Sequence, residues 1–294
     1  MQHPRDQMRF SVIVPAYNEA AYLGHALDSL LHQDYDGRYE VIVVDNNSSD
    51  ETAAIAARYG VRVVSEPQQG VCAARQRGVD CARGEIIIST DADTTQPRDW
   101  LRTIDARFTG SESVVAVAGP CRYKNPSWWA KAFPILLFGL VAAIHTLTGF
   151  VFYVSATNFA IRRTAFPGYD LKLTQGGDEL DLLRRLRRRG QVSWERQNVV
   201  TTSARRLQRG LLYNLFVSFF VYYLLAYWFN RLAQRQAFGM APAFRQERLR
   251  SFSPGVVPRR VVLGILLVGL TSLGFATGAG PAAVDSLANL WHGP

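Results

Sequence analysis

Two carboxylates follow a run of apolar residues in the segment IIISTDADTTQP, residues 86–97. The apolar run is typical of a buried strand, and Asp91 and Asp93 lie two residues apart just beyond it. Alternation along an extended chain puts both carboxylates on the same side, where they repel each other unless a cation lies between them. A divalent ion, Mg²⁺ or Mn²⁺, would relieve this repulsion, and substrate phosphates commonly complete its coordination shell. An Asp-x-Asp pair alone is more often a solvated turn or a helix cap.

The first half of the chain alternates between strand-like and helix-like segments. We expect strands at 11–14, 39–45, 61–65, 85–90 and 114–119, and helices at 19–33, 50–59, 71–82 and 97–108. The strands are continuously apolar, as expected when helices cover both faces of a sheet. This alternation predicts a doubly wound α/β domain, in which ligands bind at the carboxyl ends of the strands. Those ends carry the polar stretches PAYNE, DNNSSD, SEPQQG and DAD.

Composition narrows the partners and the compartment. The 294 residues carry a formal net charge of +9, which favours polyanionic partners such as anionic lipids and phosphorylated substrates. No nucleic-acid motif accompanies this charge, so we expect no nucleic-acid partner. The first strand is not followed by a Gly-x-Gly-x-x-Gly turn, which argues against a nicotinamide-binding domain. The three cysteines are odd in number and have no metal-ligand spacing, so we expect neither a disulfide framework nor a zinc site.

Three apolar segments in the second half suggest contact with a membrane. Residues 261–279 are uncharged and close to the roughly 20 residues that span a bilayer, and Arg259 and Arg260 before them favour a cytoplasmic start. We therefore expect a C-terminal transmembrane helix in an inner or plasma membrane, with the catalytic domain in the cytoplasm. Residues 211–229, rich in Tyr and Phe, predict an interfacial helix, with a buried core helix as the alternative. For residues 133–154, interfacial or re-entrant membrane contact and core packing fit equally well.

The expected division of the chain follows from these segments. Residues 1–205 would form the α/β domain, residues 206–260 an interfacial helix and a basic linker, and residues 261–294 the transmembrane helix and tail. The polar start, MQHPRDQMRF, is not typical of a signal peptide.

Five segments carry a resemblance to a known family. In chain order they are VIVPAYNEAAYLGHALDSL, VIVVDNNSSDET, GVCAARQRGVDCARGEIIISTDADT, SATNFAIRRTAF and GGDELDLLRRLRRRG. Over residues 8–205 the chain resembles glycosyltransferase family 2, the inverting enzymes of GT-A fold, with a mixed sheet, that use nucleotide-sugar donors. The resemblance implies transfer of one sugar from a nucleotide-diphosphate sugar to an acceptor hydroxyl, assisted by Mn²⁺ or Mg²⁺. The apolar tail resembles that of members that glycosylate lipids, which implies a lipid-linked or other apolar acceptor.

The resemblance also implies which residues bind the donor. The base and ribose pocket would be lined by Pro15, Ala16, Tyr17 and Glu19. Asp45 would accept a hydrogen bond from the base, and Arg75 would lie near the phosphates. Asp91 would approach the ribose or the metal, and Asp93 would ligate the metal. Considered locally, Glu19 is also a favourable helix first-turn acid, Asp45 an Asx-turn residue and Arg75 a surface helix charge.

A catalytic base is implied at the start of a later helix. The family uses a Glu-Asp pair there, whereas this chain has the reverse order, Asp178-Glu179. Register puts Glu179 at the base position and leaves Asp178 as its rival, although both are also favourable helix N-terminal acids. Thr157 and Asn158 fall where the family shapes the sugar or acceptor pocket.

Two alternatives to this function are a retaining transferase of the same fold and a membrane-anchored nucleotide-sugar-binding module with a degenerate site. The acidic pair at 178–179 favours inversion, and intact Asp91 and Asp93 argue against degeneracy. Arg205 and Arg206 have two interpretations. They could hold a diphosphate or a lipid phosphate, or they could be charges at the membrane surface.

Overall fold

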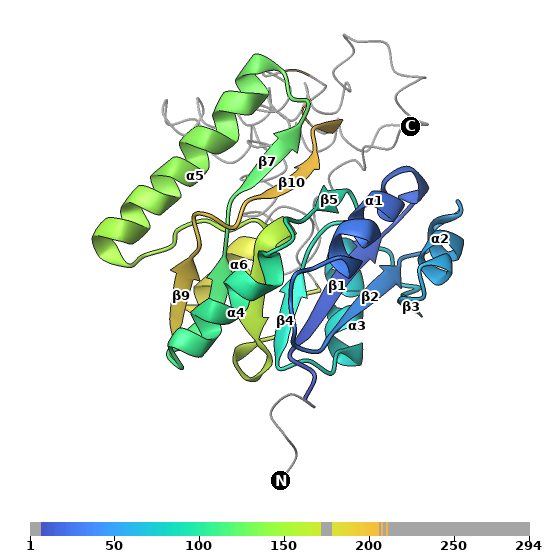
Figure 1. Ribbon diagram of the computed structural model, residues 1–294, viewed down its shortest axis with the longest axis horizontal. Coiled ribbons are helices and arrows are strands. Elements are labelled where there is room, and N and C mark those ends of the chain that lie inside the picture. The colour runs from blue at the N-terminus through green and yellow to red at the C-terminus, as the bar shows by residue number, and fades with distance from the viewer. Residues whose placement is uncertain (1–6, 172–177, 206, 208–209, 211–294) are drawn as a thin grey trace, which may run out of the picture. The chain divides into compact units, whose positions relative to one another are not determined.

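The computed structural model describes residues 7–171, 178–205, 207 and 210 (Figure 1). Within this part the chain forms an α/β domain around a seven-stranded mixed sheet in the order β3-β2-β1-β4-β8-β6-β9. The predicted α/β class with a mixed sheet is confirmed. The predicted interfacial segment 211–229, the linker beyond residue 210 and the transmembrane segment 261–279 lie outside the described residues.

Parallel strands form one side of the large sheet. They are β1 (Phe10–Ala16), β2 (Tyr39–Asp45), β3 (Arg62–Ser65) and β4 (Ile86–Ser89). β1 and β2 pair in register from Phe10 opposite Tyr39 to Ala16 opposite Asp45, so both strands end at the same edge. On the other side, β8 (Phe159–Arg162) is antiparallel to both β4 and β6 (Val114–Ala118), and β9 (Gln191–Trp194) is parallel to β6.

Helices cover both faces of the parallel strands, as their continuous apolar sequences require. The helices that follow these strands are α1 (Ala20–Leu31), α2 (Thr52–Arg58), α3 (Val71–Cys81) and α4 (Trp100–Gly110). Alternate residues of β1 serve the two faces: Val12 belongs to the core with α1 and α4, whereas Ile13 belongs to a second core with Ala74 of α3. Gly78 of α3 allows this close packing, because a Cβ atom there would lie 2.4 Å from Ile13 Cγ2.

A smaller three-stranded sheet stands beside the large one. Its order is β5 (Thr94–Thr95), β10 (Val200–Ser203) and β7 (Cys121–Lys124). The remaining elements are α5 (Trp128–Thr148), α6 (Asp178–Leu186) and two short 3₁₀ helices, η2 (Ala156–Asn158) and η3 (Arg163–Ala165). β10 pairs antiparallel with β5 and parallel with β7, which places β5, directly after the Asp-x-Asp pair, next to a strand more than 100 residues later in the chain.

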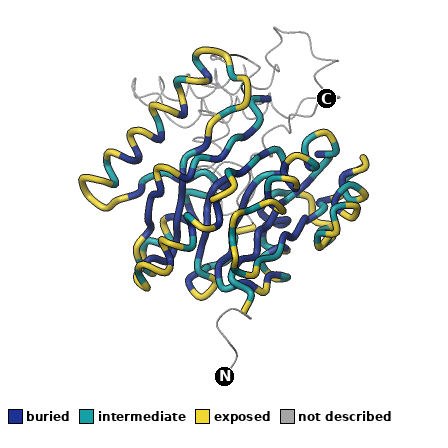
Figure 2. The backbone as a smooth tube through the Cα atoms, viewed as in Figure 1, coloured by how far each residue is buried: buried dark blue, intermediate teal, exposed yellow. Residues whose placement is uncertain are grey.

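Helix α5 packs through one side only. Phe138 stacks on Trp194 of β9 at 5.7 Å between ring centroids, and Ala130 and Val141 are fully buried. The opposite side is apolar but exposed: Leu136 is 73% exposed and Leu147 83%. Figure 2 shows this exposure recurring along the helix. Among the described residues, α5 is the one helix long and apolar enough to cross a membrane.

Candidate active site

Two loops at the carboxyl edge of the sheet are tied together by hydrogen bonds. Asn18, which follows β1 and has a φ of 53°, accepts a bond of 2.8 Å from Ser49 N and donates its own N–H to Ser48 Oγ at 3.0 Å. Asp50 accepts from Ala20 N at 3.1 Å, which satisfies an N–H at the start of α1. These bonds hold the PAYNE and DNNSSD stretches side by side.

Asp45 ends β2 with an acceptor that nothing in the described chain satisfies. Its side chain is half-buried, and Oδ1 is buried without a hydrogen-bond donor among the residues that the structure describes. An unsatisfied buried acceptor costs about 1–3 kcal/mol. An N–H group of a ligand would satisfy it.

The residues around Asp45 form a rigid frame. Asn46 donates to the carbonyl oxygens of Glu66 and Gln68 at 2.8 and 2.7 Å and accepts from Gly70 N at 2.7 Å. The loop after β3 is thereby fixed against the end of β2. Of the predicted base-pocket residues, Ala16 is buried and its carbonyl accepts from Asn46 N at 2.9 Å, and the side chains of Pro15 and Tyr17 are half-buried.

Arg75 holds the first carboxylate of the Asp-x-Asp pair. It lies on α3, is 4% exposed, and donates from Nη2 to Asp91 Oδ1 at 3.1 Å. The sequence interpretation as a surface charge is therefore wrong, because the guanidinium is buried beside Asp91. Its place next to the pair is consistent with the predicted position near donor phosphates.

Arg205 binds two carboxylates from distant parts of the chain. Its guanidinium donates to both Glu19 oxygens at 2.8 and 2.7 Å and lies 2.9 Å from Asp93 Oδ2. Its Cζ atom lies 4.9 Å from the ring centroid of Tyr22, a cation–π geometry. Burial lowers the pKa of the Arg205 guanidinium, but the bonds to Glu19 and the charge of Asp93 outweigh burial and raise that pKa. Arg205 is thus a buried cation of the site rather than a membrane-surface charge.

The Asp-x-Asp pair suits a hard divalent cation chemically. Asp91 and Asp93 offer carboxylate oxygens, the ligands that Mg²⁺ and Mn²⁺ prefer. The guanidinium on Asp93 marks a position that favours positive charge. No cluster of three or more His, Cys, Asp or Glu side chains able to hold a metal occurs in the described part of the chain. The pair would therefore hold an ion together with phosphate oxygens of a substrate.

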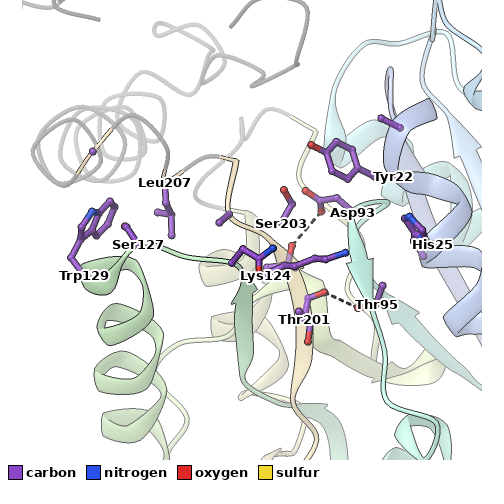
Figure 3. Close-up of a pocket in the computed structure, with 16 residues that line it drawn as sticks. Tyr22, His25, Asp93, Thr95, Lys124, Ser127, Trp129, Thr201, Ser203 and Leu207 are labelled. Carbon is purple, nitrogen blue, oxygen red and sulfur yellow. Dashed lines mark hydrogen bonds between the residues drawn. The ribbon is translucent and has the colours of Figure 1, made fainter.

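Asp93 also lines a pocket of about 500 Å³ (Figure 3). Its walls come from α1, β5, β7, β10 and the start of α5, and its lining includes Tyr22, His25, Lys124, Trp129 and Thr201. Sequence reasoning missed this pocket. The only available signal was the i, i+3 spacing of Tyr22 and His25, which places both on one face of a predicted helix. The partners on β7 and β10 come from short strands that the sequence pattern did not indicate.

Thr157 and Asn158 lie inside the domain and do not line this pocket. Thr157 is 7% exposed, and its carbonyl accepts from Thr90 Oγ1 at 2.9 Å. Asn158 is 2% exposed and accepts from Trp100 Nε1 at 2.9 Å. The structure therefore gives Asn158 a buried bracing position, and its contact with a sugar or acceptor stays a prediction.

The predicted base lies in the first turn of α6. Glu179 is half-buried, with Oε2 inaccessible to solvent. The side chain of Asp178 and the preceding residues 172–177 lie outside the described part of the chain. Asp181, two residues after Glu179 in α6, pairs with Arg184 at 3.1 Å and Arg185 at 2.7 Å, which explains part of the arginine run as helix-stabilising pairs.

The α/β fold that carries this acidic edge is shared by proteins of known structure. The chain superposes on glucosyl-3-phosphoglycerate synthase from Mycobacterium tuberculosis, solved with Mn²⁺, UDP and glucosyl-3-phosphoglycerate, with a TM-score of 0.56 over 78% of this chain and 81% of that chain, at 20% identity. S. aureus TarS 1-349 with UDP-GlcNAc superposes with a TM-score of 0.53 over 67% of this chain and 58% of that chain, at 21% identity. These likenesses establish a GT-A-like fold.

The sequence defines the family more closely. Residues 11–169 match the model of glycosyl transferase family 2. The chain belongs to this family. It is 33% identical to glycosyltransferase AglE of Haloferax volcanii over 124 residues, 40% of either chain. It is also 33% identical to a dolichyl-phosphate beta-glucosyltransferase of Dictyostelium discoideum over 120 residues, 35% of this chain and 37% of that one. The matches thus span less than half of these two relatives.

Proposed function

We propose that the protein is a membrane-associated, inverting glycosyltransferase that moves one sugar from a nucleotide-diphosphate sugar to a hydroxyl of a lipid-linked or other apolar acceptor. The observation that carries this proposal is the acidic edge at the ends of β1, β2 and β4, where Glu19, Asp45 and the Asp91–Asp93 pair lie. The structural neighbours solved with UDP or a UDP-sugar support a nucleotide donor.

The nucleobase and the diphosphate of the donor each have matching residues at this edge. The buried oxygen of Asp45, for which the described residues provide no donor, suits an N–H group of the nucleobase. Arg75 and Arg205 supply positive charge for the diphosphate. Asp91 and Asp93 would hold a divalent cation, which would supply charge neutralisation of the leaving nucleoside diphosphate when bound.

A carboxylate at the start of α6 would complete the chemistry. Glu179 would take the proton from the acceptor hydroxyl as that oxygen forms its bond to the anomeric carbon. The nucleoside diphosphate leaves from the opposite face, so the anomeric configuration inverts. Asp178 is the rival for this proton transfer, because it lies one position earlier in the same helix turn.

The acceptor would enter by the pocket beside Asp93. Its lining combines the apolar side chains of Trp129 and Leu207 with the polar ones of Lys124 and Ser203. Trp129 belongs to α5, whose exposed apolar side exceeds what isolated surface residues explain. We infer that α5 lies in the membrane interface, that residues 261–279 span the membrane, and that the catalytic domain faces the cytoplasm.

Transfer into a lipid fraction tests this function. Membrane vesicles carrying the full chain would be incubated with radiolabelled UDP-sugars and GDP-sugars and a lipid extract. We expect label from one donor in the organic phase, with the sugar in the anomeric configuration opposite to that of the donor. Asp93→Ala should abolish transfer, whereas Asp80→Ala, which removes an exposed carboxylate from α3, should leave it unchanged. Label retained only in the water-soluble fraction would overturn the apolar acceptor, and retained configuration would overturn inversion.

A further inference from the structure

Asp93, the predicted metal ligand, is paired with the guanidinium of Arg205. A metal ligand needs a carboxylate oxygen available to the ion, yet Asp93 Oδ2 lies 2.9 Å from Arg205 Nη2, and its side chain is 10% exposed. Thr202 Oγ1 approaches the other oxygen, Oδ1, at 3.3 Å. A divalent ion on Oδ2 would meet the guanidinium at the same atom.

Arg205 is held firmly in this position. Two bonds of 2.7 and 2.8 Å form a forked pair with Glu19, and the ring of Tyr22 lies against the guanidinium. A fork of this kind is stronger and more directional than a single bond between neutral groups. Glu19 comes from the β1–α1 connection and Arg205 from the residues after β10, so the pair joins the two sides of the site.

We propose that Arg205 is an internal counterion of Asp93 that competes with the divalent cation, so that the site binds the ion strongly only together with a nucleoside diphosphate. The diphosphate brings oxygen ligands for the ion and an alternative anion for the guanidinium, which relieves the competition. The inference rests on the proposed donor site. It adds that metal binding depends on the nucleotide, because Arg205 is already paired with the Asp93 carboxylate.

The first experiment measures the ion without nucleotide. Mn²⁺ would be titrated into the detergent-solubilised full chain while electron paramagnetic resonance follows the free ion. Arg205→Gln removes the competing charge and should tighten Mn²⁺ binding by about tenfold, equal to ~1.4 kcal/mol. Arg122→Gln is the matched control, because Arg122 is an exposed arginine on β7 that donates to Thr201 Oγ1 rather than to Asp93. It should bind Mn²⁺ as the wild type does.

A second variant guards against misfolding. Arg205→Gln leaves the buried Glu19 carboxylate without its forked partner, which is costly for a buried charge. Glu19→Gln/Arg205→Gln removes both members of the pair and still releases Asp93. It should also bind Mn²⁺ more tightly than the wild type. Unchanged or weaker Mn²⁺ binding in this folded double variant would overturn the proposal.

Nucleotide affinity should change in the opposite direction to Mn²⁺ affinity in Arg205→Gln. In EDTA, UDP or GDP should bind Arg205→Gln about tenfold more weakly than the wild type, because a phosphate-facing cation has been removed. If Arg205 were only structurally important, its replacement would weaken the binding of both Mn²⁺ and nucleotide. Under the proposed competition, the replacement strengthens Mn²⁺ binding and weakens nucleotide binding. If neither nucleotide binds the wild type under any condition, the proposed donor site fails, while the Mn²⁺ result alone still decides the competition at Asp93.

Discussion

Trp100 Nε1 donates a hydrogen bond of 2.9 Å to Asn158 Oδ1, and both side chains are buried. The Asn158 amide in turn donates to the carbonyl of Asn198 at 2.6 Å. Asn158 therefore connects α4, which follows the Asp-x-Asp loop in the chain, with the segment that leads into β10. A residue expected to touch substrate thus braces two elements that carry the site.

Replacing Asn158 with Ala tests this bracing role. The change leaves a buried indole N–H and a backbone carbonyl without partners, so we expect a loss of about 2–4 kcal/mol in the free energy of unfolding. KM for the acceptor should stay near the wild-type value. Chemical denaturation and initial-rate kinetics measure the two quantities. Ser127→Ala, at an exposed residue that does line the pocket, is the control. Unchanged stability with a raised KM in Asn158→Ala would restore the residue to the acceptor site.

Substitutions of Glu179 and Asp178 should change kcat to different extents. Glu179→Gln should retain nucleotide binding and lower kcat by about 10²–10⁴-fold, because it removes the proton acceptor and little else. Asp178→Asn should change kcat by less than about tenfold. Steady-state kinetics with a fixed donor separates them. If Asp178→Asn carries the large loss and Glu179→Gln does not, the base assignment is reversed.

The exposed apolar side of α5 should reside in lipid. A fluorescent label on Leu136→Cys, in the full chain reconstituted in vesicles, should be quenched by spin-labelled lipids. The control is Leu31→Cys, an exposed leucine on α1, which should stay in water. Both variants would carry Cys81→Ser, so that the label reacts only with the introduced cysteine. The other two cysteines, Cys72 and Cys121, are buried. Burial also raises the pKa of the Cys121 thiol to about 12, which keeps it protonated and unreactive. Equal, weak quenching at both positions would contradict the interfacial helix.

The parallel half of the sheet was predictable because its signals are local. The expected strand 39–45 is β2 as found, and the expected helix 71–82 differs from α3 by one residue. Continuous apolar runs and the polar stretches after them locate such strands without knowledge of their neighbours. The position of Asp45, Asp91 and Asp93 along one edge followed from the same pattern.

The short strands and the Arg205 contacts were not predictable, because they depend on pairing across long distances in sequence. β5 has two residues and β10 four, with threonines that also suit loops. Arg205 reaches Glu19 across 186 positions of the chain, so no spacing rule relates them. The sequence offered phosphate binding or a membrane surface for Arg205, and the ion pair with Asp93 became visible only in three dimensions.

Calorimetry of nucleotide binding tests the donor site most directly. UDP and GDP would each be titrated with Mn²⁺ into the detergent-solubilised wild type and into Asp45→Asn. The wild type should bind one of the two nucleotides, and Asp45→Asn should bind it at least about tenfold more weakly, since the acceptor for the base N–H has been changed. Absence of binding of either nucleotide to the folded wild type would contradict the donor site at this edge of the sheet.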